Sequence, residues 1–292
     1  MQTDTHRNTT GVLLALAGGV LMGGIGIAGK LGAGAGLSPF QLLAAQVILL
    51  APVAGVALYL RHGTPGFRPA RPGILVLRTL CGFTYFASFY WAVQGIPVAD
   101  ALVLESTNPF FAMFISLVFL RQRVSIAAIG LAVLAFLGVC LILLEHSAKT
   151  MLNPYSLLAL LAGVARAGGS VTTGVAGRSE PPERIMFYYA LGMFLFSGLA
   201  LCIEWRPIKA SDLWILALPA IMFLPQNLAY TVANRLAPAY LVGALFYSAI
   251  LVGVLADRLL FKTTLGMQGL FGMIITIAAG LGLAWLRSRE SH

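Results

Sequence analysis

Apolar runs of about twenty residues recur along the whole chain, and they constrain its fold more than any other feature. Each run is long enough to cross about 30 Å of hydrocarbon as a helix. A transmembrane barrel needs segments of about ten residues with strict alternation, and none stands out. With 59% hydrophobic residues and only 19 basic and 10 acidic ones, the chain lacks the polar surface of a water-soluble domain. The sequence therefore predicts an all-α polytopic membrane protein.

Ten transmembrane helices can be placed along the chain, joined by short segments rich in Pro and Gly. An even number of spans leaves both termini on one side, and most Lys and Arg residues fall in segments on that side, which predicts cytoplasmic termini. Residues 1–10 and 287–292 are then short cytoplasmic tails. The predicted spans are 11–30, 38–60, 73–94, 98–120, 124–144, 154–176, 184–204, 211–235, 238–260 and 265–286.

Composition argues against several other classes of protein. The net charge of +9 comes mainly from residues between the spans, where they set topology, so no nucleic-acid partner is expected. The three cysteines lie inside spans, which argues against a disulfide framework. The four histidines lie in a tail or in loops, so no metal, cofactor or catalytic group is expected in the membrane. Without a Ser–His or Cys–His pair or a phosphate-binding loop, the chain is predicted not to be an enzyme.

The two halves of the chain resemble each other. LLALAGGVLMGG at 13–24 aligns with LLALLAGVARAG at 157–168, with seven identities. WAVQGIPVADALVLES at 91–106 aligns with VANRLAPAYLVGALFY at 232–247, which sets Pro97 over Pro238. Each half has five spans, an odd number, so the second half enters the membrane from the opposite side. We therefore expect two inverted five-helix repeats, 11–144 and 154–286, around a central cavity with a substrate site near the midplane.

The sixth predicted span carries the most informative polar residues. Arg166, Ser170 and Thr173 follow one another at i, i+4 and i+7 and so share one helix face. Arg166 lies near the middle of the bilayer, where a cation is costly and is usually functional. Its planar guanidinium suits a substrate carboxylate. The alternatives are a structural ion pair that locks the two halves together and an arginine that extends to the membrane surface.

The fourth predicted span carries Glu105 and Asn108 just ahead of Pro109. Proline cannot donate to the carbonyl four residues back, so a kink and a free carbonyl are expected at Glu105. Irregular backbone at membrane depth is tolerated where it lines a cavity. Glu105 is then the candidate partner of Arg166, a proton carrier, or a ligand for a substrate amine. A purely structural ion pair is an equal alternative.

Further polar and aromatic residues lie on the third, eighth and ninth predicted spans. Such a combination suits a pocket for a small amphipathic solute, although each aromatic side chain alone is better explained by packing. The candidates are Tyr85, Ser88, Phe89, Gln226, Asn227, Tyr230 and Tyr247. Glycines are assigned to close helix packing rather than to binding. They are Gly19, Gly23 and Gly26 in the first span, Gly130 and Gly138 in the fifth, and Gly272 and Gly280 in the tenth.

The chain resembles the drug/metabolite transporter superfamily over essentially its whole length. The resemblance lies in two five-helix repeats, in the Pro-marked entry into 97–120, and in a last helix of each half that is rich in small residues. The EamA-type ten-helix exporters are the most similar type, and among them the YddG-like amino-acid exporters. The chain departs from the family at Gln122-Arg123, where a Glu-Arg pair is common. That glutamate is interpreted as a helix-end feature, so the change affects the transport hypothesis little.

The resemblance implies export of amino acids, including apolar and aromatic ones, or of similar small metabolites by alternating access. A bacterial cytoplasmic membrane, a lipid environment and a monomer are expected. The alternative within the superfamily is a multidrug or lipophilic-cation exporter, but the first and sixth spans lack a carboxylate and Arg166 would repel a cation. Exchange of organic phosphates would require several cations, and besides Arg166 only Arg78 is a candidate. A passive channel remains a further alternative.

Overall fold

The computed structural model describes the backbone at residues 2–119, 125–146, 153–236, 242, 245–263 and 266–290, and the described secondary structure is helical. The α-helices are α1 Gln2–Gly34, α2 Pro39–Val47, α3 Leu50–His62, α4 Pro72–Gly95, α5 Val98–Glu105, α6 Asn108–Phe119, α7 Ile126–His146, α8 Pro154–Ala176, α9 Pro182–Leu201, α10 Leu213–Leu236, α12 Ser248–Leu259 and α13 Met267–Glu290. Two short 3₁₀ helices, η1 Thr64–Phe67 and η2 Ala210–Asp212, lie in connections.

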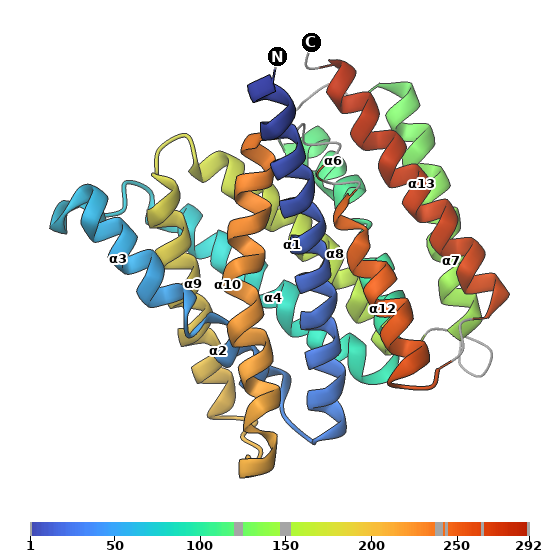
Figure 1. The fold of residues 1–292 in the computed structure, drawn as a ribbon, viewed down its shortest axis with the longest axis horizontal. Helices are drawn as coiled ribbons and strands as arrows, with labels where there is room; N and C mark the ends of the chain where they lie inside the picture. Colours follow the sequence, from blue (N-terminus) through green and yellow to red (C-terminus); the bar gives the residue numbers. More distant parts are fainter. Residues whose placement is uncertain are drawn as a thin grey trace.

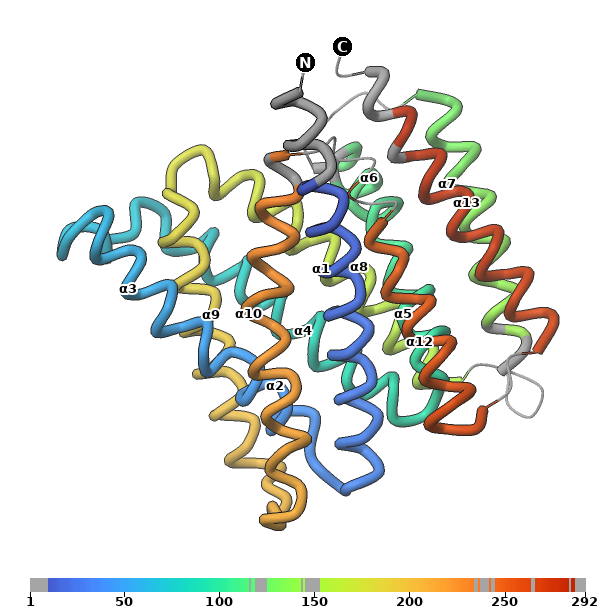
Figure 2. The backbone as a smooth tube through the Cα atoms, viewed as in Figure 1, coloured from blue at the N-terminus to red at the C-terminus, as the bar shows by residue number. Residues whose placement is uncertain are grey.

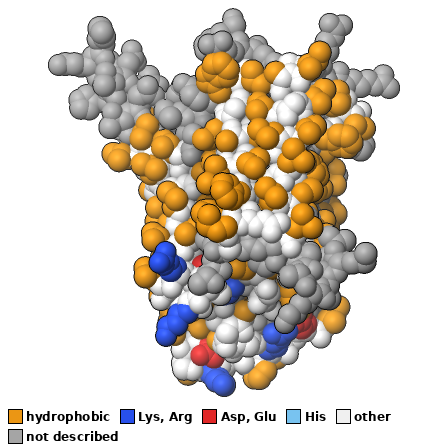
Figure 3. Space-filling view, turned by 90° about the vertical axis from the view of Figure 1, so that its right-hand side faces the viewer, with side chains coloured by type: hydrophobic (Ala, Val, Ile, Leu, Met, Phe, Trp, Pro, Cys, Tyr) orange, Lys and Arg blue, Asp and Glu red, His pale blue; other side chains and the backbone are white. Residues whose placement is uncertain are grey.

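Length and hydropathy identify the chain as a multi-pass membrane protein. Within the described residues, seven helical segments are long and apolar enough to cross a bilayer. Two shorter apolar helices, Ile126–Ile142 and Met267–Leu283, lie in the last predicted span of each half. Figure 3 shows hydrophobic side chains over most of the described part of one face, with Lys, Arg, Asp and Glu gathered toward one end. The predicted class is therefore confirmed.

Prolines start many of the helices, as the sequence predicted for the connections. Proline is well tolerated in the first turn because it has no N–H to leave unpaired there. α2, α4, α8 and α9 all begin with a proline, and α5 follows directly after Pro97. Ser38 adds a capping box with Gln41 at the start of α2. Pro238 lies outside the described residues, as does the Gln122-Arg123 pair.

Two predicted spans are broken in the middle. The fourth span divides into α5 and α6 at Ser106 and Thr107, which confirms the kink expected ahead of Pro109. The second span divides into α2 and α3 around Ile48 and Leu49, a break that the sequence analysis missed. The ends also differ, because α1 begins at Gln2, within the predicted tail, and α13 continues to Glu290.

Three helix pairs make the most extensive contacts in the bundle. They are α4 with α8, α1 with α10, and α7 with α13, and Figures 1 and 2 show α7 and α13 side by side at one edge. The start of α1 and the end of α13 lie at the same end of the bundle (Figure 1). We call this the termini end.

Close packing explains most of the predicted packing glycines. A Cβ on Gly138 would lie 2.7 Å from the Gly272 carbonyl oxygen across the α7–α13 contact. Gly19 and Gly23 of α1 lie similarly close to α12. The packing prediction is wrong for Gly130, because a Cβ there would meet no described atom within 4 Å.

A buried carboxylate joins two loops at the termini end. Glu180, between α8 and α9, accepts hydrogen bonds from the Arg71 backbone N–H (2.7 Å) and the Arg184 guanidinium (2.7 Å). Arg184 also donates to the Gly66 carbonyl (2.5 Å), so the loop before α4 is tied to the start of α9. Burial alone would raise the pKa of the Glu180 carboxyl, but these hydrogen bonds hold it below its usual value.

Candidate functional site

An ion pair between α5 and α8 lies at the centre of the candidate site. The Arg166 guanidinium donates to the Glu105 carboxylate, across 61 residues of sequence. The Glu105 side chain is 2% exposed, whereas that of Arg166 is 26% exposed. Arg166 also lies over the Tyr85 ring of α4, with its Cζ atom 5.5 Å from the ring centroid. The two residues selected from the sequence are thus brought together, with the arginine on the accessible side.

Helix α8 has two exposed faces on opposite sides. One is apolar and carries Leu157, Leu161 and Val164. The other is polar and carries Arg166, Ser170 and Thr173, roughly 180° away at about 100° per residue. Closer to the start of α8, residues on this second face, such as Ala159 and Ala162, are fully buried. The polar face therefore becomes accessible only from Arg166 toward the termini end.

The break between α5 and α6 packs directly against α8. Asn108 Nδ2 donates to the Glu105 carbonyl oxygen (3.3 Å), the atom that Pro109 was expected to leave free. A Cβ on Gly163 would lie 3.1 Å from that same oxygen and 3.2 Å from the Leu104 carbonyl oxygen. Gly163 thus lets the broken backbone approach α8 closely, which positions Glu105 for Arg166. The role of Gly163 could not be predicted from the sequence, because one Gly in a Gly/Ala-rich helix provides no distinguishing signal.

The remaining predicted residues divide between buried and accessible positions. Tyr85 and Ser88 are buried, and Phe89 is completely so, beside Gly26 of α1. Such positions are typical of core packing. By contrast, Tyr230 is 43% exposed and makes an edge contact with Phe246.

The predicted amide pair lies on α10, one helix turn before Tyr230. Asn227 Nδ2 donates to the Phe223 carbonyl oxygen (3.0 Å) and to Gln226 Oε1 (3.0 Å). The Gln226 side chain is buried. Tyr247 lies at a turn just before α12, and its hydroxyl occupies the space beside Gly280 of α13. Asn227 is thus held within α10, and Tyr247 is packed against α13.

Arg78 of α4 is a candidate site residue that sequence reasoning set aside. Its Nε donates to Thr173 Oγ1 (2.6 Å), so it contacts the polar face of α8. Its Cζ atom lies 4.1 Å from the centroid of the Tyr189 ring of α9. Its sequence position near a helix end suggested an interfacial arginine, and only the α4–α8 packing reveals the contact with Thr173.

Charged groups at the end opposite the termini hold three helices together. Asp257 of α12 accepts hydrogen bonds from the Val98 and Ala99 backbone N–H groups (3.0 and 2.8 Å) and so caps the start of α5. Lys30 Nζ donates to the Ile96 carbonyl oxygen (2.6 Å). Asp257 is therefore buried against α5, although its place near the end of a predicted span would suit an interfacial pair with the adjacent Arg258.

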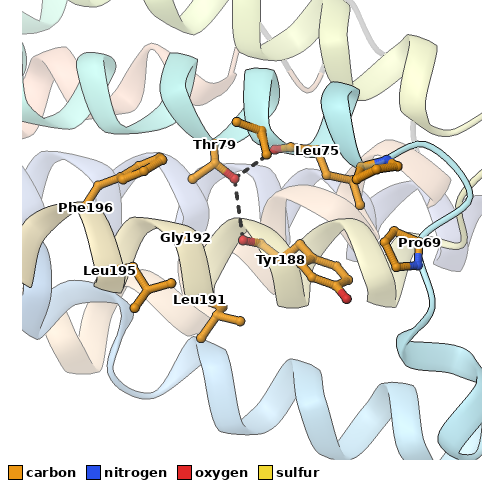
Figure 4. A pocket seen from close by; sticks show the side chains of 10 residues that line it. Pro69, Leu75, Thr79, Tyr188, Leu191, Gly192, Leu195 and Phe196 are labelled. Carbon is orange, nitrogen blue, oxygen red and sulfur yellow. Dashed lines mark hydrogen bonds between the residues drawn. The ribbon is translucent and has the colours of Figure 1, made fainter.

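A separate apolar pocket of about 280 Å³ lies between α4 and α9. Figure 4 shows Leu75 and Thr79 of α4 opposite Tyr188, Leu191 and Leu195 of α9. None of the predicted site residues lines this pocket. Within the described residues, no group of three or more His, Cys, Asp or Glu side chains comes together to hold a metal ion.

Comparison with known proteins shows which membrane proteins this chain is similar to. Residues 9–144 match the EamA-like transporter family. One solved crystal structure shares the fold over 97% of this chain and 99% of its own, with a TM-score of 0.61 and 19% identity. At that identity the likeness concerns the fold alone.

Two of the relatives have names that state what they transport. A pseudopaline exporter of Pseudomonas aeruginosa is 30% identical over 151 residues, which are 51% of this chain and 53% of the exporter. A riboflavin transporter of Brucella anthropi is 27% identical over 210 residues, which are 67% of this chain and 72% of that protein. The chain thus spans about half the length of the exporter that it matches. Together these similarities show that the chain resembles membrane transporters of small molecules, with the EamA-like match confined to residues 9–144, and they agree with the prediction that the chain is not an enzyme.

Proposed function

We propose that this protein exports amino acids or similar small metabolites across a bacterial cytoplasmic membrane by alternating access. The observation that carries the proposal is the polar face of α8, buried before Arg166 and accessible beyond it. Polar groups and a charged pair at membrane depth mark a substrate pathway when they face water rather than lipid. The opening then leads from the termini end, taken as cytoplasmic, to the Arg166–Glu105 pair.

The helix contacts support two inverted repeats. Under the predicted alignment α1 corresponds to α8, and α10 corresponds to α4. Exchanging the halves turns the α1–α10 contact into the α8–α4 contact, and these two are among the most extensive in the bundle. The break in α5–α6 at Ser106 also aligns with Tyr247, which forms a turn just before α12. Equivalent contacts and equivalent breaks are expected of halves that rock around one central site.

The groups at the site favour a metabolite with a carboxylate. Arg166 would bind the carboxylate, and Glu105 or a hydroxyl group would bind an amine. The named relatives transport pseudopaline and riboflavin, so small polar metabolites fit the family. A multidrug exporter of lipophilic cations is less well supported, because Arg166 and Arg78 place two cations on this pathway.

Transport by purified protein in proteoliposomes tests this proposal. Uptake of each of the twenty amino acids is measured with and without the same unlabelled compound on the far side. A carrier is expected to be accelerated several-fold by unlabelled substrate in trans, because the loaded carrier returns faster than the empty one. An acceleration ratio of one, with flux linear in concentration, would indicate a passive channel. Absence of flux for every amino acid, and for riboflavin measured in the same way, would contradict the proposal.

A further inference from the structure

Arg78 is a cation inside a membrane-spanning helix, and the proposed site built on Arg166 and Glu105 gives it no role. It lies six residues after the start of α4, about 9 Å along the helix. An arginine at this depth could extend to the membrane surface. Its contacts with Thr173 of α8 and Tyr189 of α9 instead hold the guanidinium between three helices.

Glycines on both sides provide the space for this guanidinium. A Cβ on Gly82 of α4 would lie 3.0 Å from Arg78 Nη1, and a Cβ on Gly169 of α8 would lie 3.4 Å from it. A Cβ on Gly82 would also lie 2.3 Å from the Tyr189 ring. Missing side chains at these two positions thus create a slot for the arginine. A solvent-exposed arginine needs no such slot, so the arrangement is typical of a positioned group.

The acidic side chains that the structure describes do not balance the charge of Arg78. Within the part of the chain that the structure describes, the ion pairs leave Arg78 without a carboxylate partner. Glu105 neutralises Arg166. The acids Asp100 and Asp257 lie near Lys30 at the opposite end of the bundle. The accessible polar face of α8 therefore carries an excess positive charge.

We propose that Arg78, positioned by Thr173 and Tyr189, is a second anion-binding subsite and that the substrate carries a net negative charge. This inference rests on the proposed transport function. Thr173 and Arg166 are seven residues apart on α8, about 10 Å along the helix. Tyr189 lies close enough to interact electrostatically with both arginines. An amphipathic carboxylate could therefore bind first at Arg78 and then at Arg166. Within the proposed substrate class, the match is a metabolite with a net negative charge, such as an acidic or N-acylated amino acid, in preference to a neutral zwitterion.

Four probes with one aromatic body and different charges test the inference. They are N-acetylphenylalanine (an anion), phenylalanine (a zwitterion), N-acetylphenylalaninamide (neutral) and phenylalaninamide (a cation). Binding to the purified protein is measured through the shift of the thermal unfolding midpoint, which does not require transport. The anion is expected to stabilise the protein most, and the cation least. Equal shifts for the anion and the neutral amide would overturn the inference.

Variants of Arg78 connect the charge preference to this subsite. Arg78→Gln is expected to weaken binding of the anion by roughly 10- to 100-fold, the loss expected for a charge-assisted hydrogen bond. It should leave binding of the neutral amide unchanged. Arg78→Lys should retain part of the preference, and Thr173→Val should reduce it by misplacing the guanidinium. Arg68→Gln, at an exposed loop position, is the control.

If Arg78→Gln lowers binding of all four probes equally, its role is structural and the inference fails. Charge-selective binding without any flux would instead contradict the proposed transport.

Discussion

Arg166→Ala is expected to lower transport at least about 100-fold while the protein still inserts in the membrane and remains helical. The variant removes the proposed carboxylate ligand, whose charge-assisted hydrogen bonds contribute about 1.5–3 kcal/mol each. It also leaves Glu105 buried without its partner, and breaking a buried pair typically costs about 3–5 kcal/mol. Initial rates in proteoliposomes and thermal unfolding in detergent separate these two effects. Wild-type kinetics in the variant would remove Arg166 from the site.

A charge reversal distinguishes a binding arginine from a purely structural ion pair. The double variant Glu105→Arg/Arg166→Glu can rebuild a pair between α5 and α8 with the charges exchanged. We expect it to recover thermal stability relative to Arg166→Ala but not transport, because the accessible member of the pair is then an acid. Recovery of both would show that the pair only holds the helices together. Glu105→Gln adds a separate test, since loss of any pH dependence would identify Glu105 as a proton carrier.

Asp257→Ala is expected to have the second-largest effect, through the end of the bundle opposite the termini. Its carboxylate accepts both hydrogen bonds that cap α5, and α5 contacts α12 and α1 there. Removing it leaves two buried N–H groups without an acceptor and should destabilise this end of the bundle by about 2 kcal/mol or more. Alternating access requires this end to close whenever the termini end is open, so efflux without counter-substrate should rise and acceleration by trans substrate should fall toward one.

A graded pair of variants makes the Asp257 prediction specific. Asp257→Asn keeps one acceptor oxygen, so its leak should lie between those of the wild type and Asp257→Ala. Asp212→Ala is the matched control, because Asp212 lies in η2, before α10, and accepts a hydrogen bond from the adjacent Ser211 (3.0 Å). A destabilised Asp257→Ala protein that retains full trans acceleration would assign Asp257 to folding alone.

The length of the apolar runs and the positions of the prolines predicted the class of protein and most helix starts. Apolar length alone predicts a spanning helix, and proline predicts where one begins or breaks, as Pro109 did for α5–α6. The break between α2 and α3 was missed, because Ile48 and Leu49 are apolar and carry no local signal for a turn. The role of Asp257 was also missed, since its partners, Val98 and Ala99, are backbone groups more than 150 residues away.

The site could be predicted in part because charged side chains are costly within the membrane. Arg166 and Glu105 each require a partner there, and the structure pairs them with each other. Aromatic and hydroxyl residues have no such cost, and Phe89 and Ser88 are buried in the core. Arg78 was not predicted as a site residue because its sequence position near a helix end indicates its depth in the membrane but not the direction of its side chain. Its contact with Thr173 depends on how α4 packs against α8.

Cysteine accessibility on α8 tests the central claim most directly. In a protein whose native cysteines are replaced by alanine, Ser170→Cys places a thiol on the polar face and Val164→Cys places one on the opposite apolar face. Both positions are exposed in the structure. They are expected to differ only in their surroundings, because Ser170 should face water and Val164 should face lipid. A charged, membrane-impermeant thiol reagent added from the side of the termini is expected to label Ser170→Cys rapidly and Val164→Cys hardly at all. Equal labelling of both thiols, or of neither, would contradict a water-filled opening that leads to Arg166.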